Sequence, residues 1–157
     1  VLLANAVGKP LSDYASEKLW KPAGMERDAL WMVDRAGFER GGCCIAATLR
    51  DYGRFGLFVL EGGVVGGQAM LPRGWMEEAT SVQISDGAPA PGYGYFWWLP
   101  PSGGYEAAGV FGQSITTFPT ERVIVVTNAA WPSAGSDDLW AAQAAFVAAA
   151  RKAALVD

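Results

Sequence analysis

Apolar residues recur at helical spacing in five segments of the chain, and this periodicity predicts five helices. They cover residues 1–7, 10–24, 48–62, 72–80 and 137 to about 156. The third is the most regular: Thr48 and Asp51 have the spacing of a capping box, and a buried stripe is predicted for Leu49, Tyr52, Phe55, Gly56 and Val59. Ser136 is a suitable N-cap for the last helix.

Between the last two predicted helices the pattern becomes that of strands. Strands are predicted for residues 93–99, 113–118 and 122–128, which are rich in aromatic and β-branched residues. The run "VIVVT" is apolar on both faces, as in a central strand that is covered on both sides. No clear period is present in residues 26–44 and 81–92, which are predicted as loops, or in "GGVVGG" (62–67), predicted as a plain turn. Helices, strands and a final helix predict an α+β fold, an antiparallel sheet with helices packed on it.

Composition narrows the function classes. The 157 residues carry a net charge of −4, and an acidic chain is a poor candidate for nucleic acid binding, which needs clustered cations. No apolar run approaches the length of a membrane span. The chain has no histidine, which excludes Ser-His-Asp triads and most zinc sites within it. No cofactor or metal is predicted, and nothing indicates a compartment.

The only two cysteines, Cys43 and Cys44, are adjacent. Because a disulfide between neighbours is rare, we expect two small apolar side chains in a glycine-rich segment rather than a bond, a nucleophile or a metal site.

The segment "GVFGQ" (109–113) begins a predicted strand with two glycines, although glycine weakens strands. Gly109 could let a ligand approach the backbone, and the Val110 N–H could then stabilise an oxyanion. A bulge or a tight corner is the alternative reading. Similarly, "GYGYFWW" (92–98) could be a stacking platform for a ligand or a strand with aromatic core packing.

Taken together, several segments resemble the C-terminal half of the serine β-lactamase-related hydrolases, which include class C β-lactamases, esterases and 6-aminohexanoate-dimer hydrolases. The segments are "GKPLSDYASEKLWKPAGM", "GGCCIAATLRDYGRFGLFVLEGG", "LPRGWMEEAT", "GYGYFWW" and "GVFGQSITTFPTERVIVVTNAAW". The resemblance covers almost the whole chain and implies part of a β-lactamase/penicillin-binding-protein-like transpeptidase fold.

The resemblance also implies a mechanism. The nucleophilic Ser of an S-x-x-K motif and the Tyr of a Y-x-N motif would precede Val1, so residues 1–157 would be the C-terminal portion of one domain. The family's Lys-Thr-Gly motif corresponds here to Ala107-Ala108-Gly109, which lacks the cation. This departure argues against efficient penicillin or cephalosporin hydrolysis and leaves amide or ester hydrolysis open.

The leading hypothesis is therefore a fragment of a serine hydrolase acting on a small amide or ester, with its N-terminal half as partner. Val110 and Gly109 would form part of the oxyanion site. Candidate pocket residues are Trp31, Gly41, Gly42, Tyr93, Tyr95, Trp97 and Gln113. On a strand, Tyr93, Tyr95 and Trp97 would share one face and Trp98 the other, so only one set could meet ligand. The alternatives are an inactive binding or regulatory module of the same fold and a truncated gene product.

Overall fold

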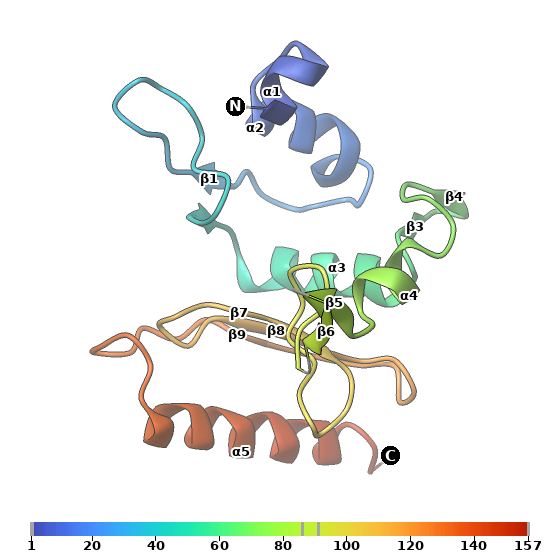
Figure 1. Ribbon diagram of the computed structural model, residues 1–157, viewed down its shortest axis with the longest axis vertical. Coiled ribbons are helices and arrows are strands. Elements are labelled where there is room, and N and C mark those ends of the chain that lie inside the picture. Colours follow the sequence, from blue (N-terminus) through green and yellow to red (C-terminus); the bar gives the residue numbers. More distant parts are fainter. Residues whose placement is uncertain (1, 86, 91, 157) are drawn as a thin grey trace. The chain divides into compact units, whose positions relative to one another are not determined.

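The computed structural model describes residues 2–85, 87–90 and 92–156 (Figure 1). The chain forms two compact units, one up to Phe55 and one from Gly56 onward. Both helices and antiparallel strands are present, which confirms the α+β prediction. Among the described residues, no helix is both long and apolar enough to cross a bilayer.

The first unit contains helices and one small hairpin. Helices α1 (Leu2–Val7) and α2 (Leu11–Ala15) are followed by a π-helical turn, η1 (Ser16–Trp20). Strands β1 (Leu30–Trp31) and β2 (Ile45–Ala46) pair antiparallel, and a bridge between Val33 and Glu39 extends the hairpin. The prediction of an irregular loop over residues 26–44 was therefore wrong, because strands of two residues are too short to produce a period.

Asp51 fixes the start of helix α3 (Leu49–Leu60) within the first unit. Its backbone N–H donates to the Thr48 hydroxyl (3.1 Å), and that hydroxyl donates to its carboxylate (2.8 Å), which confirms the predicted cap. The carboxylate also accepts the N–H groups of Glu26 (2.7 Å) and Arg27 (3.3 Å). Burial would raise the pKa of Asp51, but these donors and the nearby Arg54 guanidinium favour the carboxylate and hold its pKa below the ordinary value.

The second unit is built on a three-stranded antiparallel sheet, in the order β7 (Tyr105–Ala108), β8 (Ser114–Phe118) and β9 (Val123–Thr127). Figure 1 shows helix α5 (Asp137–Ala153) along one face of this sheet. Phe118, Val125 and Val147 form the hydrophobic core between that face and α5. Ser136 caps α5, as predicted, by accepting the Leu139 N–H (3.4 Å).

The last turns of α3 cover the opposite face of the sheet. A Cβ atom on Gly56 would lie 2.6 Å from Ile124 Cγ2, so only glycine lets the helix pack this closely. The β9 strand is thus covered on both faces, as its sequence predicts. It is not a central strand within the described residues, because β8 is its only partner and its outer edge is unpaired.

Two predictions for the segments between α3 and the aromatic segment need correction. The "GGVVGG" segment is a hairpin of β3 (Val64–Val65) and β4 (Gln68–Ala69), not a plain turn. After the predicted short helix α4 (Trp75–Ala79), the expected loop contains the paired strands β5 (Gln83–Ser85) and β6 (Ala88–Ala90). All these strands have two or three residues.

The aromatic segment "YGYFWWL" is not an extended strand. It reverses direction: Tyr93 pairs with Trp98, and the Gly94 N–H donates to the Trp97 carbonyl (2.8 Å). Phe96, at the turn, has a positive φ of 65°. The expected alternation of side chains between two faces therefore does not apply, and each aromatic ring has its own environment.

The adjacent cysteines form a disulfide, Cys43–Cys44. The expectation of two unbonded, space-filling side chains was wrong. Both residues are exposed rather than packed in the interior.

Candidate functional site

The "GVFGQ" segment forms the hairpin loop between β7 and β8. The Gly109 N–H donates to the Gln113 carbonyl (2.7 Å), and the Gly112 N–H donates to the Gly109 carbonyl (3.1 Å). The loop is anchored to the following segment as well, since Val110 accepts the Gly135 N–H (2.9 Å) through its carbonyl oxygen. Gly109 and Val110 therefore lie in a tight loop just beyond the end of β7.

At both glycines in this loop, a larger residue would collide with a neighbouring side chain. Gly112 has a φ of 85°, and a Cβ atom there would lie 2.4 Å from the Trp131 ring. Gly109 has no positive φ, but a Cβ atom would lie 2.6 Å from Gln113 Oε1, which accepts the Phe111 N–H (3.2 Å). The Gln113 side chain is exposed, so this hydrogen bond lies at the surface. The loop is thus a tight corner, and its tip projects outward.

At this tip, the Val110 backbone N–H has no hydrogen-bond partner among the described residues. The residue is 60% exposed. The neighbouring strand edge is open too. Glu106 exchanges both backbone hydrogen bonds with Trp98 (2.9 Å each) on the outer side of β7, so the backbone groups of Ala108 point to that same side. No described residue pairs with Ala108 there.

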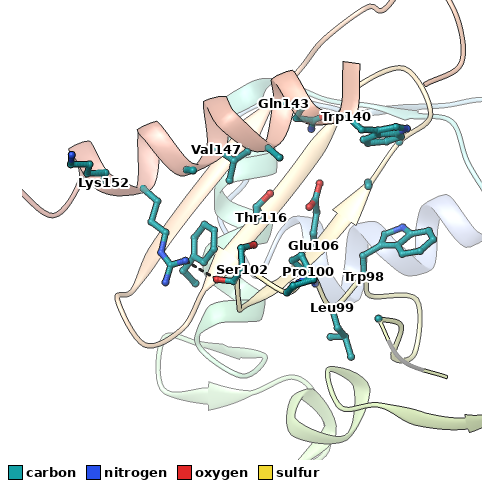
Figure 2. Close-up of a pocket in the computed structure, with 18 of the residues that line it drawn as sticks. Trp98, Leu99, Pro100, Ser102, Glu106, Thr116, Trp140, Gln143, Val147 and Lys152 are labelled. Carbon is teal, nitrogen blue, oxygen red and sulfur yellow. Dashed lines mark hydrogen bonds between the residues drawn. The ribbon is translucent and has the colours of Figure 1, made fainter. Parts of the chain in front are cut away.

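A cavity of about 920 Å³ begins at this loop and extends between the sheet and α5. Gly109 and Val110 line one end, and Arg151 and Lys152 line the other. Figure 2 shows Glu106 and Thr116 projecting from the sheet toward α5. Apolar side chains make up much of the remaining lining, among them Trp98, Phe118, Trp140, Ala144 and Val147.

The cavity contains polar atoms without partners. Thr116 is 2% exposed, and neither its hydroxyl nor Gln143 Oε1 has a hydrogen-bond partner among the described residues. Burial raises the pKa of the neighbouring Glu106 carboxyl. Arg151 is engaged: it pairs with Glu121, donates to the Ser102 carbonyl (2.9 Å) and lies 4.1 Å from the centre of the Phe118 ring. The cavity therefore offers a few polar groups, the Thr116 hydroxyl and the Gln143 side-chain oxygen among them, in mainly apolar surroundings.

Comparison with known proteins identifies the family. A profile of the beta-lactamase family matches residues 1–149. The chain belongs to the beta-lactamase family. It is 28% identical over 142 residues to a 6-aminohexanoate-dimer hydrolase of Paenarthrobacter ureafaciens, with 83% of this chain and 36% of that protein covered.

Solved structures agree with this assignment to the beta-lactamase family. A Bacillus anthracis protein provisionally described as a 6-aminohexanoate-dimer hydrolase superposes with a TM-score of 0.79 at 26% identity, covering 96% of this chain and 41% of that one. A Mycobacterium bovis β-lactamase has a TM-score of 0.65 at 19% identity, covering 94% and 59%, and supports the fold alone. The chain thus spans well under half the length of the two hydrolase-named relatives.

Within this beta-lactamase-family chain, the predicted aromatic pocket residues are dispersed. Trp97 is 9% exposed and packs edge-on against the Tyr105 ring at 5.1 Å. Tyr93 and Tyr95 are exposed; Tyr93 packs on Trp98 (4.8 Å) and Tyr95 on Trp75 (6.0 Å). Gln113 lies in the hairpin loop with Val110. Their substrate contacts stay predictions.

Trp31, Gly41 and Gly42 lie together in the β1–β2 hairpin of the first unit. The Trp31 indole N–H donates to the carbonyls of Arg40 (3.0 Å) and Cys43 (3.2 Å), which flank the two glycines. Their pocket role likewise stays a prediction.

Sequence reasoning missed the cavity residues of this beta-lactamase-family chain. Glu106, Thr116 and Gln143 come from three separate elements, and only the pairing of Glu106 with Thr116 in the sheet brings the first two together. One signal was available, since three of the five residues in "SITTF" are polar although the strand proves to be fully buried. No group of three or more His, Cys, Asp or Glu side chains within the described ranges could hold a metal ion.

Proposed function

We propose that this chain is the C-terminal part of a longer serine hydrolase that cleaves amide or ester bonds through an acyl-enzyme. In this proposal the Val110 N–H is one of two oxyanion donors. The observation that carries it is that the N–H of the exposed residue Val110 has no partner among the described residues and follows the open edge at Ala108. A backbone donor fixed at a loop tip costs no reorganisation when negative charge develops on a carbonyl oxygen.

The nucleophile and its base would come from the rest of the longer protein. No serine in this chain is followed by lysine three residues later, and there is no histidine. The nucleophilic hydroxyl would attack the substrate carbonyl carbon and lose its proton to a base. The carbonyl oxygen would then accept a hydrogen bond from the Val110 N–H. The amine or alcohol would leave protonated, and water would then hydrolyse the acyl-enzyme.

The substrate class follows from the relatives and from one departure in sequence. Two relatives are named for hydrolysis of a 6-aminohexanoate dimer, whose units are joined by an amide. Because Ala107 supplies no cation, we infer a small amide or ester that is not anchored by a carboxylate at this position. Tyr93, Tyr95, Trp97, Gln113, Trp31, Gly41 and Gly42 remain candidates for the substrate pocket.

The rest of the longer protein would also cover surfaces that this chain leaves open. The outer edge of β9 has no strand partner among the described residues, and the Thr116 hydroxyl and Gln143 Oε1, in the cavity beside α5, have no hydrogen-bond partner there. The lengths of the relatives support this inference, since the chain covers only 36% and 41% of them. In isolation the chain should therefore associate or aggregate through these faces.

The test is a pair of substitutions in the longer protein. Val110→Pro removes the N–H, and Val110→Ala keeps it and serves as the matched control. We expect turnover of a short amide or ester to fall by about 10²–10³ in Val110→Pro and to stay near normal in Val110→Ala. A folded Val110→Pro protein with near-normal turnover would contradict the assignment. Absence of turnover in the unsubstituted protein would favour the inactive binding module instead.

A further inference from the structure

The Cys43–Cys44 disulfide is exposed and directly precedes β2 in the β1–β2 hairpin. It closes a small ring between neighbouring residues and joins no distant parts of the chain, so it does not serve as a long-range crosslink. Exposure gives an attacking thiolate access to both sulfur atoms, and access is one of the determinants of exchange rate. This position and connectivity suit a reactive pair better than a structural one.

The ring holds an unusual backbone conformation. Cys44 has a φ of 77°, in the left-handed region that non-glycine residues rarely adopt. With that conformation, the Cys44 carbonyl accepts the Met32 N–H (3.0 Å) and the Cys43 N–H donates to the Arg40 carbonyl (3.2 Å). The Trp31 indole N–H donates to the Arg40 and Cys43 carbonyls. The four-residue turn 41–44 thereby orients Trp31.

We propose that Cys43–Cys44 is a reversible thiol–disulfide exchange site for dithiols, and that its state determines whether the turn holds Trp31. The inference rests on the exposure, adjacency and hydrogen bonds of the pair, and it is independent of the hydrolase proposal.

The exchange is balanced with a dithiol as the reductant. One thiolate of the dithiol attacks the sulfur of one cysteine, the Cys43–Cys44 bond breaks, and the other cysteine leaves as a thiolate. The second thiol of the dithiol, as thiolate, then attacks the first sulfur of the same dithiol, which is bonded to the cysteine in the mixed disulfide. This step releases that cysteine as a thiolate. The dithiol is oxidised to a disulfide, and the cysteine pair gains two electrons and takes two protons from solvent and the reacting thiols.

Reduction should loosen the turn. Without the ring, Cys44 can return to a negative φ, which any non-glycine residue prefers. Its carbonyl and that of Cys43 then rotate away from the Met32 and Trp31 donors. The Arg40–Gly41 peptide bond, whose carbonyl accepts two hydrogen bonds in the oxidised form, becomes accessible to a protease.

The chain contains a protease site and an internal control within this hairpin. Trypsin cleaves after Arg40, and it also cleaves after Arg35 in the separate turn where the Gly37 N–H donates to Asp34 (3.1 Å). The protein is treated with or without dithiothreitol, alkylated with iodoacetamide and digested briefly. We expect alkylation of both cysteines only after reduction, and cleavage after Arg40 to rise on the order of tenfold relative to Arg35.

Two double variants distinguish the effect of the disulfide ring on the backbone conformation from the effect of the thiol groups themselves. Cys43→Ser/Cys44→Ser should be cleaved after Arg40 as fast as the reduced protein, with no response to dithiothreitol. Cys43→Ser/Cys44→Gly should be cleaved more slowly, because glycine adopts a positive φ without cost. Three results would each overturn the proposal: alkylation without reductant, unchanged cleavage after reduction, or equal cleavage of the two variants.

Discussion

Among the described residues, ten hydrophobic side chains are buried in the unit from Gly56 onward, whereas the only buried side chain in the unit up to Phe55 is that of Asp51. Packing of Phe118, Val125 and Val147 between sheet and helix organises the second unit. Hydrogen bonds to Asp51 and a disulfide in a hairpin organise the first.

This difference has a physical consequence. Hydrophobic burial is non-directional and insensitive to protonation, so the second unit depends mainly on the volume of its core side chains. Hydrogen bonds to a buried carboxylate depend on its charge and on each donor. The first unit should therefore respond to pH and to single polar substitutions, and the second to cavity-forming ones.

The largest expected effect on stability is that of Phe118→Ala in the second unit. Phe118 is 2% exposed, and its loss leaves a cavity beside Val125 and Val147. We expect a decrease of about 3–5 kcal/mol in the free energy of unfolding, measured by urea denaturation. Phe146→Ala is the control, because Phe146 is 57% exposed and should cost less than about 0.5 kcal/mol. Equal effects would contradict the account of the core.

Asp51→Ala is the corresponding test of the first unit. It leaves the N–H groups of Glu26 and Arg27 and the Thr48 hydroxyl without their acceptor. Hydrogen exchange of the Glu26 and Arg27 amides should accelerate on the order of tenfold or more, with little change in the amides of β8. Uniform acceleration across both units would mean that they do not differ as described.

One buried group in each unit should contribute to stability over its own pH range. The pKa of Asp51 lies below its ordinary 3.8, so its contribution is present above pH 3.8 and is lost as pH falls through the folded value. Burial raises the pKa of Tyr105 from 10.0 to about 12, so that contribution is complete below pH 10 and is lost as pH rises toward 12.

Hydrogen exchange of the Glu26 amide in acid would follow the titration of Asp51. Tyrosinate absorbance in alkali would follow the titration of Tyr105. Asp51→Asn should flatten the acid transition alone, and Tyr105→Phe should remove a late-titrating phenol from the alkaline one. Titration of every tyrosine near pH 10 would show that the Tyr105 ring is not buried as the structure has it.

The smallest expected effect concerns two hydroxyls on β8. Ser114 shares a hydrogen bond with Thr127 (2.9 Å), whereas the Thr116 hydroxyl has no partner among the described residues. Ser114→Ala should cost about 0.5–1.5 kcal/mol, and Thr116→Val should be neutral or slightly stabilising in this chain. A cost for Thr116→Val equal to that of Ser114→Ala in urea denaturation would mean that the Thr116 hydroxyl has a partner.

The elements that could be predicted from sequence are those with a long period or a cap. Helices α3 and α5 have both, and β8 and β9 were found through their β-branched residues. The short hairpins were missed because two or three residues cannot show alternation. The aromatic turn was missed because nothing in its composition indicates the positive φ of Phe96.

Prediction of the candidate site was limited in a different way. The segment with Gly109 and Val110 was predicted to begin a strand, whereas it forms a hairpin loop in which the Trp131 ring, distant in sequence, packs closely on Gly112. The cavity depends on the register of β7 with β8 and on the position of α5 against the sheet. Both are properties of the tertiary structure. The disulfide was rejected on the general rarity of bonds between adjacent cysteines.

The most direct measurement of the central claim is identification of the serine that reacts with a fluorophosphonate in the longer protein. Labelling is followed by proteolysis and mass spectrometry of the modified peptide. The account predicts a single labelled serine outside the 157 residues of this chain, with labelling slowed by Val110→Pro and unaffected by Val110→Ala. A labelled serine within residues 1–157 would contradict it.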